Sequence, residues 1–96
     1  MNFEEFTQNL TLPTPPDHYS QALKALWYDK LGDWEKAHNL AQDIHTPIGA
    51  WIHAYLHRKE GDIWNADYWY QQAGRKRPNQ TLDQEWQAMV ASVLAT

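Results

Sequence analysis

Two Gly-Asp pairs, Gly32-Asp33 and Gly61-Asp62, most constrain how this chain of 96 residues can fold. The segments ALWYDKLGDWEKAHNLA, from Ala25, and AYLHRKEGDIWNADYWY, from Ala54, align around these pairs without a gap. In each segment a helical pattern ends at the glycine, which allows a tight reversal, and the aspartate can cap a second helix. A unit repeated in this way predicts one helical hairpin that is used twice.

Signals for helix starts and stops account for the rest of the chain. Asn, Asp or Thr stands before each apolar period, and glycine or proline follows every period except the last. No segment alternates as a half-exposed strand does. The predicted caps are Asn2, Asp17, Asp33, Thr46, Asp62 and Thr81. The sequence therefore predicts an all-α fold of five to six short antiparallel helices, at residues 3–10, 18–31, 34–44, 47–60, 63–73 and 82–95.

The chain is expected to form a single helical-repeat domain over residues 1–96, because so short a sequence buries one thin core. Its expected parts are a short helix with a proline-rich linker at 1–16, the first hairpin at 17–45, the second hairpin at 46–78 and a capping helix at 79–96. The capping helix is amphipathic, with an apolar face of Leu82, Trp86, Met89, Val90 and Val93. Such a face is expected to cover another part of the molecule.

Composition narrows the possible functions. The net charge of -4 argues against nucleic-acid binding, which depends on Lys and Arg that neutralise phosphates. The absence of cysteine excludes disulfides, thiolate ligands and thiol nucleophiles. The start MNFEEFTQNL lacks the pattern of a signal peptide, and no apolar stretch is long enough to span a bilayer. We therefore expect a cytoplasmic protein with no membrane partner and no cofactor.

The repeated hairpin resembles the tetratricopeptide repeat family. The family's turn, small, aromatic and terminal-proline positions are matched in the second unit by Gly61-Asp62, Ala66, Tyr70, Ala73 and Pro78. In the first unit they are matched by Tyr28, Gly32-Asp33 and Ala37, with Ala41 at the aromatic position and a shortened connection to the next unit. The resemblance covers residues 18–78 and implies two stacked hairpins with a groove. The segment from Trp51 to Arg75 also resembles one in small bacterial proteins of this general shape.

The same resemblance implies a site for a protein or peptide partner. Trp51, Tyr55 and Arg58 occupy one side of a helix, where tetratricopeptide proteins tend to face the concave groove. The aromatic rings would supply contact area, and the guanidinium would meet a carboxylate of the partner. The alternative is that the first and sixth helices cover this groove, which makes Trp51 and Tyr55 core residues.

His53 and His57 stand four residues apart, on a flank away from the apolar stripe of their helix. The repeat register favours histidines packed inside the hairpin, where each ring needs a hydrogen-bond partner. The expected partners are Tyr28, Asp29, Asn65 and Asp67. Two alternatives remain, a polar recognition site and a metal site with at least one further ligand. Candidate further ligands, which only the fold can bring near, are Glu60, His38, Asp67 and His45.

Two surface features are also ambiguous in the sequence. Trp64 and Tyr68 share a separate flank of the fifth helix, as either a satellite cluster or an exposed contact patch. The basic segment 75–77 follows the end of that helix, where cations favour the unpaired carbonyl groups. Its alternative role is contact with a phosphate or an acidic partner.

These features together predict a non-catalytic module that binds or scaffolds a protein or peptide through Trp51, Tyr55, Arg58, His53 and His57. One alternative is a metal-binding protein or metal-dependent hydrolase centred on His53 and His57. A second is a homodimeric structural protein held together by an uncovered apolar edge. An enzyme is the less favoured class, because no local catalytic signature is present.

Overall fold

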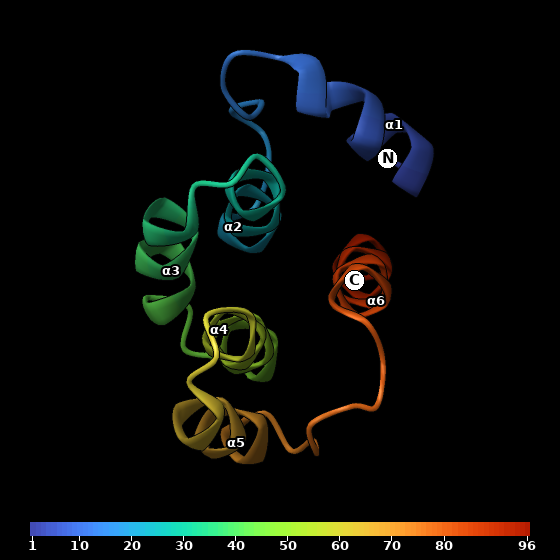
Figure 1. Ribbon diagram of the computed structural model, residues 1–96. Coiled ribbons are helices and arrows are strands. Elements are labelled where there is room, and N and C mark those ends of the chain that lie inside the picture. The colour runs from blue at the N-terminus through green and yellow to red at the C-terminus, as the bar shows by residue number, and fades with distance from the viewer.

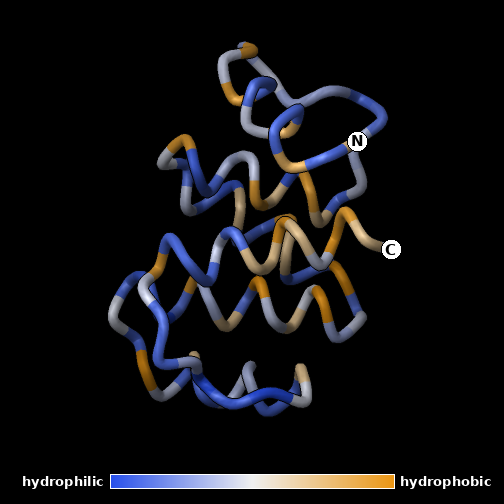
Figure 2. The backbone as a smooth tube through the Cα atoms, turned by 90° about the vertical axis from the view of Figure 1, so that its right-hand side faces the viewer, coloured by the Kyte–Doolittle hydropathy of each residue, from blue (hydrophilic) through white to orange (hydrophobic).

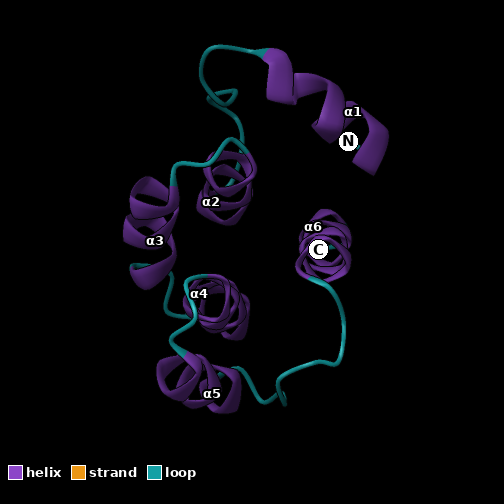
Figure 3. Ribbon diagram, in the orientation of Figure 1, coloured by secondary structure: helices purple, strands orange, loops and turns teal.

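The computed structural model describes residues 1–96, and all of its regular structure is helical. The helices are α1 (Phe3–Gln8), α2 (Gln21–Lys30), α3 (Trp34–Gln42), α4 (Pro47–Lys59), α5 (Ile63–Gln72) and α6 (Leu82–Leu94), with one 3-10 turn at Asn9–Thr11. Figure 3 shows that tight loops join the four central helices, whereas longer loops lead from α1 and into α6. The prediction of an all-α fold with five to six helices is confirmed. None of these helices is long and apolar enough to cross a membrane.

Capping side chains set where most of these helices begin. At α6 the full capping box forms, because Thr81 accepts from the Gln84 amide at 3.1 Å and Gln84 accepts from the Thr81 amide at 3.0 Å. The predicted cap of α2 is wrong. Ser20, rather than Asp17, accepts the first-turn hydrogen bond, and Asp17 lies in a turn closed by the Tyr19 amide and the Pro16 carbonyl.

The two hairpins, α2 with α3 and α4 with α5, have nearly the same turn. Gly32 and Gly61 adopt φ values of 88° and 87°, which a side chain would strain. The amide that follows each glycine donates to an equivalent carbonyl, from Asp33 to Tyr28 at 3.0 Å and from Asp62 to His57 at 2.9 Å. The repeated sequence therefore folds into a repeated local structure.

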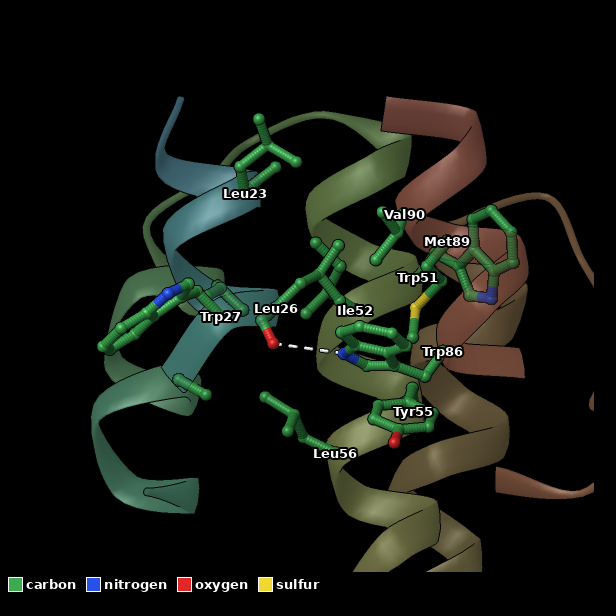
Figure 4. Packing of buried hydrophobic residues seen from close by; sticks show 14 of the residues in the cluster. Leu23, Leu26, Trp27, Trp51, Ile52, Tyr55, Leu56, Trp86, Met89 and Val90 are labelled. Atoms are coloured by element: carbon green, nitrogen blue, oxygen red, sulfur yellow. Dashed lines mark hydrogen bonds between the residues drawn. The ribbon is translucent and has the colours of Figure 1, made fainter. Parts of the chain in front are cut away.

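α6 returns to pack across α2 and α4 (Figure 1). Its Trp86 indole enters the core between these helices and donates to the Leu26 carbonyl at 3.1 Å (Figure 4). Phe6 of α1 closes one end of the core against Trp86, with ring centroids 5.9 Å apart. Figure 2 shows hydrophobic positions recurring along α6 and the central helices, as expected when each buries one face. α6 thus contributes to the main core of the protein.

Candidate functional site

α4 carries all five candidate site residues, and the fold directs them to two different sides. Trp51 and Arg58 bond to a residue of α6, and Tyr55 is buried in the same core. His53 and His57 instead approach aromatic and imidazole rings of α3 and α5. The predicted residues therefore form two separate groups rather than one site.

The group toward α6 is organised around a buried carboxylate. The Glu85 side chain is 0% exposed and accepts from the Trp51 indole at 3.0 Å and from the Arg58 guanidinium at 2.7 Å. The Tyr70 hydroxyl lies 2.9 and 2.6 Å from its two oxygens. Burial raises the pKa of the Tyr70 hydroxyl, and the Glu85 carboxylate raises it further. The hydroxyl therefore stays protonated and remains a hydrogen-bond donor. Arg58 also donates to the Gln80 carbonyl.

Arg58 meets a carboxylate, as the sequence predicts for the groove, but this carboxylate belongs to the same chain rather than to a partner. Trp51 and Tyr55 are buried, and the Arg75 guanidinium lies 3.5 Å from the centroid of the Trp51 ring. α6 therefore occupies the side on which a peptide was expected. Sequence reasoning missed Glu85, although its position between Leu82 and Met89 places it within the apolar stripe of α6.

The second group is a cluster of three histidines, in which His38 of α3 joins His53 and His57 of α4. The Nε2 atoms of His38 and His53 are 2.9 Å apart, a hydrogen bond in which one ring donates and the other accepts. One nitrogen of each ring lies within 4.8 Å of one nitrogen of each of the other two. His57 Nδ1 donates to a carboxylate oxygen of Glu60 at 2.9 Å.

Two tryptophans hold this histidine cluster from opposite sides. The Trp34 ring stacks on His38 with centroids 4.8 Å apart, and the Trp69 ring stacks on His53 with centroids 4.2 Å apart. Trp34 is itself fixed, because its indole donates to the Leu56 carbonyl at 2.8 Å. The imidazole planes are therefore set by packing as well as by hydrogen bonds.

Burial keeps two of these rings neutral at physiological pH. Desolvation, with smaller contributions from His38 and His57, lowers the pKa of His53 to about 4. Desolvation and His57 also lower the pKa of His38. A neutral imidazole has a nitrogen with a free lone pair, which can accept a hydrogen bond or bind a metal ion.

The hydrogen-bond partners expected for the histidines are not those found. Asp29 accepts from Lys59 at 2.9 Å, and Asp67 accepts from Arg77 at 3.2 Å, so both carboxylates are engaged elsewhere. The Asn65 side chain donates to Asp62, the residue that caps α5, at 2.7 Å. Tyr28 packs on other groups, its ring lying 4.9 Å from the Lys36 ammonium nitrogen.

Among the four candidate further ligands, the fold brings two to the histidines. His38 and Glu60 make the contacts described above, whereas Asp67 and His45 lie outside the cluster. A pocket of about 340 Å³ opens beside it, and His53, Trp69 and His45 are part of its wall. The cluster is therefore next to a space large enough for solvent or a small ligand.

The positions of the aromatic pair on α5 and of the basic segment 75–77 decide between the alternatives that the sequence leaves open. Trp64 is 78% exposed and Tyr68 is 48% exposed, so they form a surface patch on α5 rather than a satellite core. In the basic segment, Arg75 stacks on Trp51 and Arg77 pairs with an acidic side chain of α5. These two cations therefore have structural contacts within the chain.

Comparison of the chain with protein-family models, with curated proteins and with solved structures finds no match. The tetratricopeptide resemblance thus stays a prediction.

Proposed function

We propose that this chain is a non-catalytic protein-binding module, and that its contact surface is the outer face of α5. The observation that supports the proposal best is the exposure of Trp64, at 78%, with Tyr68 one turn further along the helix. Tryptophan and tyrosine are enriched among the residues that dominate binding energy at protein interfaces. The class of function is the one predicted from the sequence, but the proposed contact surface is the outer face of α5 rather than the groove.

The order of the helices explains why α5 is left open. Within the stack, α3 contacts both α2 and α4, and α4 contacts α5, so the helices before α5 have neighbours on two sides. α6 does not continue the stack beyond α5, because it packs on α2 and α4 instead. The outer helix of a terminal repeat is usually polar, since it faces water. The aromatic pair on α5 departs from that rule, which supports a role in binding.

The shape of the patch favours a helical partner. Trp64 and Tyr68 are separated by four residues, so their side chains form one ridge along the helix axis. Such a ridge packs into the groove between side-chain rows of a second helix. Asp67 and Arg77 pair beside the ridge at 3.2 Å and offer charges of both signs at its rim. The proposed partner is therefore an amphipathic helix of another protein.

Site-specific cross-linking tests this proposal. A photoreactive amino acid placed at the exposed Gln71, on the same face of α5, should capture the partner and leave Trp64 intact. The captured protein is then purified, and its affinity is measured for the wild type, for Trp64→Ala and for Leu31→Ala, a matched control at an exposed leucine of the α2–α3 turn.

We expect Trp64→Ala to weaken binding by about tenfold or more, and the control to change it less than about twofold. Equal affinity in all three proteins would show that the outer face of α5 is not the contact surface. Capture of a second copy of the chain alone would favour the homodimer instead.

A further inference from the structure

We propose that His38, His53 and His57 form a binding site for one divalent transition-metal ion, with Zn²⁺ as the ion that fits best. Three ring nitrogens, drawn from two helices, lie within 4.8 Å of one another, and one of the three rings, His53, lines an open pocket. This site is separate from the surface proposed on α5, and neither proposal depends on the other.

The distances between the donor atoms are close to those that a zinc ion requires. Zinc binds histidine nitrogens at about 2.0–2.1 Å, so two nitrogens on one tetrahedral ion lie about 3.4 Å apart. The Nε2 atoms of His38 and His53 are 2.9 Å apart, and they would separate by a few tenths of an ångström. The nitrogen of His57 would move inward from a separation of at most 4.8 Å. Side-chain torsions can supply both movements without a change in the helices.

The protonation state of the cluster also fits metal binding. In the hydrogen bond between His38 and His53, one Nε2 carries a proton and the other presents a lone pair. When that proton moves to Nδ1 of its own ring, both Nε2 atoms can bind the metal with no net loss of a proton.

Outer groups around the rings resemble those that support metal-bound histidines. Such histidines usually donate their second nitrogen to a carboxylate or carbonyl, which fixes the ring and raises its basicity. Glu60 accepts from His57 Nδ1 at 2.9 Å, which leaves Nε2 of that ring as the metal ligand. The stacked rings of Trp34 and Trp69 hold the planes of His38 and His53. The outer shell is therefore partly formed before an ion binds.

The donor set selects the class of ion. Three imidazoles suit zinc, copper and nickel, whereas magnesium and calcium require oxygen ligands. Three protein ligands leave one tetrahedral position free, and the pocket beside His53 can supply water to it. The site would thus bind zinc with one coordination position open to exchange.

The test uses the full chain, purified and freed of metal with a chelator. Zn²⁺ binding is measured by calorimetry and Co²⁺ binding by visible absorption, for the wild type, His38→Gln, His57→Gln and the control His18→Gln. His18 packs on Tyr19, outside the cluster, with ring centroids 5.3 Å apart. We expect one ion per chain, an intense tetrahedral Co²⁺ band, and affinity at least about 100-fold weaker in the two cluster variants.

A second measurement needs no substitution at the cluster and so does not depend on whether the variants fold. In nitrogen-15 spectra of the wild-type histidine rings, saturating Zn²⁺ should shift the resonances of His38, His53 and His57 and leave those of His18 unchanged. Free zinc at about 100 times Kd should also raise Tm by roughly 10 °C or more. The proposal is overturned if zinc neither shifts these three rings nor raises Tm. It is also overturned if His18→Gln weakens binding as much as His57→Gln does.

Discussion

The two faces of α4 both gather polar side chains at helix contacts, but they do so in opposite ways. Toward α6, Glu85 is fully buried, and both of its oxygens accept hydrogen bonds from Trp51, Arg58 or Tyr70. Toward α3 and α5, His38 and His53 share one proton between their rings, and His53 lines a pocket. The Glu85 face is fully bonded, whereas the histidine face keeps a nitrogen lone pair that no group of the protein requires.

The contrast separates groups that hold the fold from groups that are free to bind something else. A buried charge is tolerated when protein groups satisfy it, and it then fixes how the surrounding helices pack. Neutral imidazoles are less costly to bury and keep a lone pair for a ligand. The Glu85 contacts therefore stabilise the fold, whereas the histidine cluster keeps the lone pairs on which the proposed metal site depends.

The largest effect is expected from Glu85→Ala. The change leaves Arg58 and the Trp51 indole without their acceptor in the core, so we expect a loss of about 3–5 kcal/mol in the free energy of unfolding. Urea titration measures this loss. Asp83→Ala is the matched control, because Asp83 is exposed and its pair with Lys30, at 3.3 Å, should contribute less than about 1 kcal/mol. Similar losses in the two variants would contradict the structural role of Glu85.

An intermediate effect is expected when the metal-free protein is acidified. The pKa of His53 is about 4 in the folded state and near 6.5 in the unfolded chain, so the unfolded state binds more protons between these values. Stability is full above pH 6.5 and falls as the pH decreases toward 4, by about 2 kcal/mol between pH 7.5 and pH 5. Urea titrations at a series of pH values test this.

His53→Gln should remove most of this pH dependence, and His18→Gln should leave it intact. A wild-type stability that does not change between pH 7.5 and pH 5 would mean that the histidine cluster accepts protons freely. The contrast between a neutral face and a charged face of α4 would then be lost.

The smallest effect is expected from Trp64→Ala on the isolated protein. Because the indole is 78% exposed, its removal should change the free energy of unfolding by less than about 0.5 kcal/mol. The same variant is expected to bind its partner about tenfold more weakly or worse, so stability and binding would separate. A stability loss of about 2 kcal/mol or more, measured by thermal unfolding, would instead assign Trp64 to the fold.

Local features of the sequence were enough to predict most of the fold. Gly32 and Gly61 mark the two reversals, and Thr81 with Gln84 marks the start of α6, because turns and caps depend on neighbours within a few residues. The sequence predicts Asp17 as the cap of α2, but Ser20 caps this helix. Both residue types cap helices, and Asp17 lies instead in the turn that begins at Pro16. Such a choice depends on the backbone path before the helix.

The candidate site was less predictable, because its partners come from distant segments. The sequence places His53 and His57 together, but only the crossing of α3 over α4 brings His38 to them. Arg58 was expected to meet a carboxylate, yet the pattern does not say that Glu85 of the same chain supplies it. A glutamate within an apolar stripe is the signal that could have indicated a buried, bonded acid.

The hydrogen bond between Trp86 and Leu26 spans 60 residues and has a consequence for the order of folding. The contacts within each hairpin form between segments separated by a few residues, so closing them restricts little of the chain. The contacts of α6 require most of the chain to be confined first, and long-range contacts of this kind slow folding. We therefore expect the hairpins to form early, and Glu85 to leave water only when α6 docks in the last step.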